Sequence, residues 1–385
     1  MASKSGIRRS LALAGLAAAA LAGPALGSLR VADASTVAHA PRPNVTVAAE
    51  PEVMYPTLDS TTARRSALRA AAVGPDPVLP LIYGGGIDHI GVTTGRPKVY
   101  LVFWGLPWGS PSPTRANNST SLSHDPAGEA PLLRALFRGL GTDGEQWSGV
   151  MTQYCEGVAP GATTCPASAA HVGFPSAGGA LAGVLDDTGN PVPQSPTFTQ
   201  LANEATRAAA HFGNKTPASN RNVQYVIALP HGITPAGFET QYCAWHSATS
   251  TRYGDLPFTS LPYIPDAGAT CGAGFVNGAN GALDGVTIVE GHEYAETITD
   301  QVPNGGWTDA NGDEVADKCA WNDAAGPAGA QNVTFATGSF PMQATWSNDA
   351  DACEIAHPIV TNAHRVGVHH PAEIKAATGT HRETR

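Results

Sequence analysis

The chain has 385 residues, enough for one large domain or two, and carries a formal net charge of −10. Nucleic acid and anionic membrane surfaces repel an acidic chain, so we expect neither as a partner. Only 14% of the residues are charged, whereas 43 are glycine and 31 are proline. This composition is typical of a loop-rich, rigid protein and argues against a helical bundle.

Residues 1–27 have the pattern of a secretory signal peptide. Basic residues precede an apolar run over 11–22, and a small-residue region ends at Gly27. We expect cleavage after Gly27, with Ala34 as the alternative site. No later apolar run is long enough to cross a bilayer. The sequence therefore predicts a secreted, extracellular protein without a membrane span, and we expect a monomer.

The rest of the chain divides into three segments by composition. Residues 28–80 are rich in Ala, Pro, Val, Thr and Ser without a sustained period, which predicts a disordered or weakly ordered leader or propeptide. We expect residues 81–357 to form a single globular domain. Residues 358–385 form a polar, His-containing tail, to which we assign no function.

Within the domain, strand and helix patterns alternate. Apolar runs at 98–105 and 222–230 predict strands that are buried on both faces. Helical spacing covers 131–140 and 199–212, and a shorter helix is predicted over 145–154. This alternation indicates βαβ connections. We therefore expect an α/β fold, with a three-layer core around a mixed, partly parallel sheet and a loop-rich, disulfide-stapled C-terminal part.

The six cysteines agree with an oxidising compartment. They permit three disulfides in about fifteen connectivities. A Cys-based zinc site is the alternative, but the spacings contain no C-x-x-C pair. We expect the sequential pairing because it closes the shortest loops: Cys155 with Cys165, Cys243 with Cys271, and Cys319 with Cys353.

The run from His292 to Glu296, HEYAE, lies in a predicted helix over Asp284–Thr299. Positions i and i+4 share one helix face, so His292 and Glu296 can reach a common metal ion with Glu293 beside them. The arrangement resembles the zincin H-E-x-x-H helix, with a carboxylate in place of the second His. There the intervening Glu activates water, and we assign Glu293 that role. An exposed face with solvated carboxylates is the alternative.

A zinc ion at this helix needs a third protein ligand. Asp300 follows His292 by eight residues, about 12 Å along the helix axis, so we expect it to support the site or end the helix. We favour Asp309 or His246 as the third ligand and leave the choice between them open. Glu314 and Asp317 also lie past the turn that could fold back over the helix, and His231, like His246, comes from the segment after the second predicted strand.

The acidic segment after the helix has a second interpretation. Asp309, Asn311 and Asp313 place oxygen ligands at positions 1, 3 and 5, as in a calcium loop, and Asp317 stands at position 9. The usual carboxylate at position 12 is missing, and Gly312 stands at position 4. A Gly-containing hairpin turn is the alternative. The supporting or Ca²⁺-binding residues would be Asp300, Asp313, Glu314 and Asp317.

Several motifs resemble known secreted proteins. The strand at 98–105, the YVIALP run leading into CAWH, and LDGVTI…TITD…NGGW resemble the phosphate-induced protein 1, or Exordium-like, family of cell-wall-associated proteins. The pattern HExxExxTD…GWxD…GxExxDxC, from His292 to Cys319, is similar to a group of secreted bacterial proteins. In the Exordium-like branch small and apolar residues replace the helix His and Glu. The resemblance thus implies a scaffold that requires no metal.

These observations leave two functions open. The first is a secreted Zn²⁺-dependent hydrolase, above all a peptidase, with an extracellular protein or cell-wall polymer as substrate. The second is a non-enzymatic, Exordium-like protein that interacts with cell wall or glycan and holds a structural Ca²⁺. A serine nucleophile lacks its motif. A glycosidase would need carboxylates that face each other across a cleft, whereas Glu290, Glu293 and Glu296 share one helix.

Overall fold

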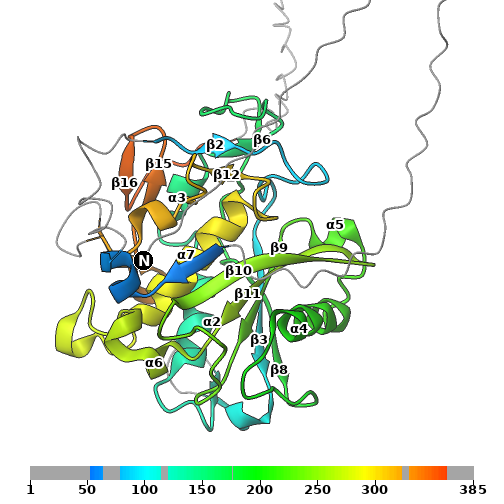
Figure 1. Cartoon of the computed structure of the whole chain (residues 1–385), viewed down its shortest axis with the longest axis vertical. Coiled ribbons are helices and arrows are strands. Elements are labelled where there is room, and N and C mark those ends of the chain that lie inside the picture. Colours follow the sequence, from blue (N-terminus) through cyan, green and yellow to red (C-terminus); the bar gives the residue numbers. More distant parts are fainter. Residues whose placement is uncertain (1–52, 64–78, 114–119, 176, 323–328, 362–385) are drawn as a thin grey trace, which may run out of the picture. The chain divides into compact units, whose positions relative to one another are not determined.

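The structure is a computed structural model that describes residues 53–63, 79–113, 120–175, 177–322 and 329–361 (Figure 1). The predicted signal peptide, most of the predicted leader and most of the polar tail lie outside the described residues. Within the described ranges, no helix is long and apolar enough to cross a membrane.

A six-stranded sheet forms the centre of the fold (Figure 1). Neighbouring strands run parallel from β8 through β3 and β9 to β11, and β10 and β1 are then added antiparallel. The predicted α/β fold with a mixed, partly parallel sheet is therefore confirmed. The strands in spatial order are β1 (Val53–Pro56), β10 (Tyr242–Thr251), β11 (Gly254–Leu261), β9 (Val223–Ala228), β3 (Lys98–Trp104) and β8 (Leu181–Asp187).

Helices cover both faces of this sheet, because successive side chains along a strand point to opposite faces. On β3, Arg134 of α2 lies over the Phe103 ring, whereas Arg207 of α4 lies over the ring of the next residue, Trp104. α7 packs beside α2 on the same face (Figure 1). The core thus has three layers. The three helices are α2 (Glu129–Gly139), α4 (Phe198–His211) and α7 (Asp284–Thr299).

Helical crossovers join the parallel strands, as expected for βαβ connections. α2 and α3 (Trp147–Met151) lie between β3 and β8, and α4 and α5 (Pro217–Asn220) lie between β8 and β9. The two crossovers run in opposite directions across the sheet, so right-handed connections put α2 and α4 on opposite faces. β9 is buried at every residue because it lies between both helical layers.

The predicted helices are present, with ends that local capping determines. α2 begins two residues before the predicted start at 131, because the Asp125 carboxylate accepts three backbone amides there. α4 begins with a capping box between Thr197 and Gln200. α3 covers only the middle of the helix predicted over 145–154.

β1 corrects part of the prediction for residues 28–80. Residues 53–63 do not form a disordered or weakly ordered leader, since β1 pairs with β10 and places Tyr55 opposite Ala244. The outer edge of β10 offers backbone groups that need partners, and the Tyr55 side chain becomes fully buried there. The propeptide interpretation stays a prediction.

Short ribbons and helices occur along the described chain, and they predominate in the C-terminal part after α7, as expected. Two-stranded ribbons pair β2 (Ile82–Tyr83) with β12 (Trp307–Thr308), β4 (Pro111–Pro113) with β5 (Thr120–Leu122), β6 (Cys155–Glu156) with β7 (Ala170–His171), β13 (Gln331–Phe335) with β14 (Gly338–Met342), and β15 (Thr345–Ser347) with β16 (Ala352–Glu354). Short helices are η1 (Leu106–Trp108), α6 (Ile264–Ala267), η2 (Gly268–Cys271), η3 (Gly278–Asn280) and η4 (Asp317–Cys319).

Three disulfides staple the loops, and they are consistent with an oxidising, extracellular compartment. The pairing is sequential, as the loop-length argument favours. The Cα atoms of the bonded residues are 5.9 Å apart for Cys155–Cys165, 5.6 Å for Cys243–Cys271 and 5.7 Å for Cys319–Cys353.

Candidate metal centre

The helix α7 is buried along all 16 residues. Its β-branched residues and glycines have low intrinsic helix propensity, so tertiary packing must stabilise it. Gly285 lets the helix backbone pack directly against the segment around Cys271, because a Cβ atom at position 285 would lie 1.8 Å from the carbonyl oxygen of Cys271. His292, Glu293 and Glu296 each have 0% exposure. The alternative of an exposed helix face with solvated carboxylates is therefore wrong.

Asp300 ends α7 and reverses the chain. Its carboxylate accepts the backbone amides of Asn304, Gly305 and Gly306 at 2.7, 3.1 and 2.6 Å, which is the helix-end role expected for it. The returning segment lies against the last turn of α7, where the amide of Asp317 donates to Glu296 Oε1 at 3.0 Å. Asp317, which follows Glu296 by 21 residues in the sequence, thus lies against the helix.

His292, Glu296 and Asp317 form a compact group of possible metal ligands. The Nε2 atom of His292 lies 2.9 Å from Glu296 Oε1 and 3.6 Å from Asp317 Oδ1. Ligands of a tetrahedral zinc with bonds of about 2.0 Å are roughly 3.3 Å apart. The two measured separations lie on either side of this value. The residue types and spacing therefore fit a zinc ion, with little movement of the side chains.

Gln343 determines the tautomer of His292. Its Nε2 donates to the carbonyl oxygens of Ala316 at 2.9 Å and Ala344 at 3.2 Å, so its Oε1 is the atom that faces His292 Nδ1 at 3.2 Å. An amide oxygen can only accept, so Nδ1 carries the proton. Burial lowers the pKa of His292 to about 4, and the neutral ring leaves a bare lone pair on Nε2.

The bare Nε2 of His292 therefore faces a carboxylate oxygen of Glu296. Nε2 forms no hydrogen bond within the described part of the chain despite the 2.9 Å approach, while Glu296 Oε1 accepts the amide of Asp317. Two buried acceptors at this distance repel each other, and an unsatisfied buried polar atom costs about 1–3 kcal/mol. A cation between the two atoms removes both costs, and this is the arrangement of metal ligands.

His246 reaches the same centre from β10. Its neighbour Trp245 points to the opposite face, where its ring lies 5.7 Å from that of Phe198. His246 Nε2 lies 2.8 Å from Glu314 Oε2 and 3.5 Å from Glu296 Oε2. Burial alone would lower the pKa of His246, but Glu314 and Glu296 outweigh it and raise the pKa well above its ordinary value. The protonated ring bridges two carboxylates, which makes it a charge partner of the ligands.

Two further carboxyl groups of α7 are buried without partners. Both oxygens of Glu290 and both oxygens of Glu293 lack a hydrogen bond among the described residues. Burial raises the pKa of each, although the charge of His246 opposes the shift. One Glu293 oxygen lies within 4.8 Å of ligand atoms of His246 and Glu296. Glu293 therefore stands beside the proposed ligands with a carboxyl group that forms no hydrogen bond among the described residues.

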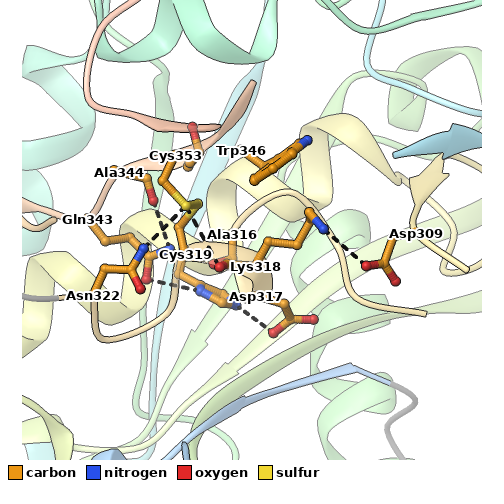
Figure 2. The surroundings of a disulfide bond; sticks show 12 residues. Asp309, Ala316, Asp317, Lys318, Cys319, Asn322, Gln343, Ala344, Trp346 and Cys353 are labelled. Atoms are coloured by element: carbon orange, nitrogen blue, oxygen red, sulfur yellow. Dashed lines mark hydrogen bonds and ion pairs between the residues drawn. A yellow bond between two sulfur atoms is a disulfide. The ribbon is translucent and has the colours of Figure 1, made fainter. Parts of the chain in front are cut away.

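Asp309 does not join this group, and the reason is local. Its Oδ1 accepts the amides of Asn311 and Asp313, and its Oδ2 pairs with Lys318 at 3.1 Å. Figure 2 shows the Lys318 side chain reaching Asp309, while Asp317 points in another direction. The hairpin-turn interpretation accounts for these bonds. A Ca²⁺ ion in this loop stays a prediction.

The remaining candidates lie apart from the centre or support it. His231 is exposed and pairs with Asp266 at 2.5 Å, and it belongs to neither compact group of ligand atoms among the described residues. Glu314 binds His246, and burial raises its pKa to about 7. Within the described ranges, the compact groups of ligand atoms do not include Asp300, Asp309, Asp313 or Glu314.

Two residues of the site carry no signal in the sequence. Gln343 orients His292 from a position 51 residues away. Tyr55 covers the same ring from β1, with 4.0 Å between the ring centroids. Neither belongs to a motif, and only the tertiary fold brings them to α7.

Comparisons of the chain with models of known families, with curated proteins and with solved structures give no match. The similarity to Exordium-like proteins therefore stays a prediction, and evidence for function comes from the chemistry of the site.

Proposed function

We propose that the protein is a zinc-dependent hydrolase that cleaves peptide bonds of extracellular proteins. The observation that carries this proposal is the 2.9 Å approach of His292 Nε2, a buried acceptor without a hydrogen bond among the described residues, to Glu296 Oε1. His292, Glu296 and Asp317 are the protein ligands of the ion. Three protein ligands leave the fourth position of a tetrahedral zinc for water, as in catalytic sites.

A zinc ion held there would polarise a substrate carbonyl and lower the pKa of a bound water to about 7. Glu293 is the general base. Its carboxyl group is buried, lies beside the ligands and forms no hydrogen bond among the described residues, so it can take a proton from a zinc-bound water and later donate it to the leaving amine. Glu314 and Glu296 raise the pKa of His246 and so favour its cationic form, and its ring lies within 4.8 Å of Glu293 and Glu296, so it can stabilise negative charge on the substrate oxygen.

Glu293→Gln tests the proposal, and Glu290→Gln is the matched control one helical turn away. The assay is hydrolysis of fluorescein-labelled casein by zinc-loaded protein, together with zinc content. We expect Glu293→Gln to lose about 10²–10⁴-fold in kcat and keep its zinc, because only the proton transfer is removed. Glu290→Gln should retain activity within a few-fold. Equal, measurable activity of wild type and Glu293→Gln would contradict the assigned role.

A second pair of variants tests the third ligand. Asp317→Ala should weaken zinc binding by at least tenfold, whereas Asp309→Ala should leave it unchanged, since Asp309 binds its own turn and Lys318. Zinc affinity is measured by competition with a chelating dye. A loss confined to Asp309→Ala would show that the third ligand is misassigned.

A further inference from the structure

The candidate centre is closed to solvent. The side chains of His292, Glu293 and Glu296 are fully buried, and so is the Tyr55 ring that lies over His292. A hydrolase must admit its substrate to the reacting atoms. Some covering element must therefore leave before the proposed reaction can take place.

β1 is the covering element. It is the outermost strand of the sheet and pairs with β10, the strand that carries His246 (Figure 1). Tyr55 stands opposite Ala244, two residues from His246, so it faces α7. Met54 stands opposite Trp245 and shares the other face. Alternation along a four-residue strand thus places one aromatic side chain over the metal ligands.

Trp321 also packs against the Tyr55 ring. Its ring stacks on Tyr55 at 4.9 Å, and its Nε1 donates to the carbonyl oxygen of Pro56 at 2.8 Å. The Tyr55 ring therefore lies between His292 and Trp321. Trp321 has a φ of 52°, which is unfavourable for a bulky residue, so the surrounding packing must hold it in this conformation.

The contacts that hold β1 at the edge of β10 are of a kind that another extended peptide can also form. They include ladder bonds to one neighbouring strand, bonds from Thr57 and Ser60 to the carbonyl oxygen of Gln241, and contacts around Tyr55. No cysteine of the three disulfides lies in residues 53–63. Addition of an extended peptide to a sheet edge uses the same ladder bonds, with side-chain pockets giving specificity. An extended substrate at this edge would lie directly beside His292 and Glu296.

We propose that the edge of β10 is the binding surface for an extended polypeptide substrate, and that β1 is a built-in occupant that blocks it. A substrate strand would run antiparallel to β10 and place a large aromatic or apolar side chain between His292 and Trp321. This inference rests on the proposed hydrolase function, because it assigns the substrate class and the regulation of that same centre.

The test uses the full chain and a labelled synthetic peptide with the sequence of residues 53–63. We expect the peptide to bind Tyr55→Ala at least tenfold more tightly than wild type, because the variant's own strand competes less well. Met54→Ala, altered on the other face of β1, should change peptide affinity less than threefold. A peptide with alanine in place of its tyrosine should not bind Tyr55→Ala. Equal binding to all three proteins, or binding to none, would overturn the proposal.

Hydrogen exchange of the wild type provides a test that needs no variant. Amides of residues 53–57 should exchange at least 100-fold faster than those of β9, because a displaceable strand opens locally. Equal protection, or loss of the cooperative unfolding transition in Tyr55→Ala, would make β1 a permanent part of the fold.

Zinc release separates this inference from the proposed function. Dipicolinate should remove zinc at least tenfold faster from Tyr55→Ala than from wild type. If neither protein binds zinc, the hydrolase proposal fails, while the peptide and exchange results still decide whether β1 is a displaceable strand. If both bind zinc and release it at the same rate, the hydrolase proposal stands and the blocking role of β1 is refuted.

Discussion

Replacing Gln343 with leucine removes the group that orients His292 and keeps the side-chain volume nearly unchanged. In the wild type, the Gln343 amide binds His292 Nδ1 at 3.2 Å and the carbonyl oxygens of Ala316 and Ala344 at 2.9 and 3.2 Å. Without it, His292 can adopt the tautomer that protonates Nε2, and this tautomer cannot bind a metal ion through Nε2, the atom that faces Glu296 and Asp317. The substitution therefore separates zinc binding from packing.

The expected magnitudes follow from these contacts. Loss of a group that orients a metal-ligating histidine lowers metal affinity about 10–100-fold. This corresponds to about 1.4–2.7 kcal/mol of binding free energy. Each buried group left without a partner also costs about 1–3 kcal/mol of folding stability. Gln343→Leu should thus show weaker zinc binding together with a lower free energy of unfolding in the metal-free state.

Gln153→Leu is the matched control. Gln153 is also buried, and its Nε2 donates to Val150 O at 2.8 Å and to Ser347 Oγ at 3.2 Å. It should lose similar stability and retain zinc affinity. Zinc affinity is measured by dye competition, and stability by urea unfolding in a chelator. If both variants lose stability and both bind zinc as the wild type does, the assigned tautomer of His292 is refuted.

Two other predictions concern stability. Replacing both Cys319 and Cys353 with alanine opens a loop of 34 residues and should cost roughly 4 kcal/mol in urea unfolding, with weaker zinc binding because η4 carries Asp317; unchanged zinc affinity would show that the disulfide does not help to position Asp317. Burial raises the pKa of Glu204 from an ordinary value of 4.5 to about 8, so the unfolded chain releases the Glu204 proton at a lower pH than the folded chain. The contribution of neutral Glu204 to folding stability is therefore fully present below pH 4.5 and is lost as the pH rises through 8. Glu204→Gln should therefore gain stability relative to wild type between pH 5 and 8, by at most about 1.4 kcal/mol per pH unit, and a difference independent of pH would contradict the raised pKa.

Much of the fold could be predicted from the sequence, because its buried strands and helices carry strong local patterns. The apolar run at 222–230 predicts β9, and the predicted bounds of α7 agree with the structure. The β10–β11 hairpin could not be predicted in the same way. β10 is buried over Tyr242–Ser247 but rich in Ser, Thr and Ala, so no clear alternation marks it as a strand. β1 lacks a pattern because four residues are too few to show one.

In the candidate metal centre too, the local contacts could be predicted from the sequence and the long-range contacts could not. The i, i+4 spacing of His292 and Glu296 is local, and it predicts their approach directly. The proposal of Asp317 as a ligand in place of Asp309 depends on how the chain turns after Asp300, where three backbone amides bind one carboxylate. Long-range contacts of this kind leave no periodic signal in a sequence, so the third ligand could only be narrowed to several residues.

Metal content tests the central claim most directly. The wild-type chain and His292→Ala are purified in parallel and equilibrated with equimolar zinc. The unbound metal is then removed, and zinc and calcium are measured by elemental analysis. Both proteins carry the same histidines at 358–385, so the difference between them reports the centre alone. The account predicts close to one zinc ion per chain that is lost in His292→Ala. Equal zinc in both proteins, or no zinc in either, would contradict it.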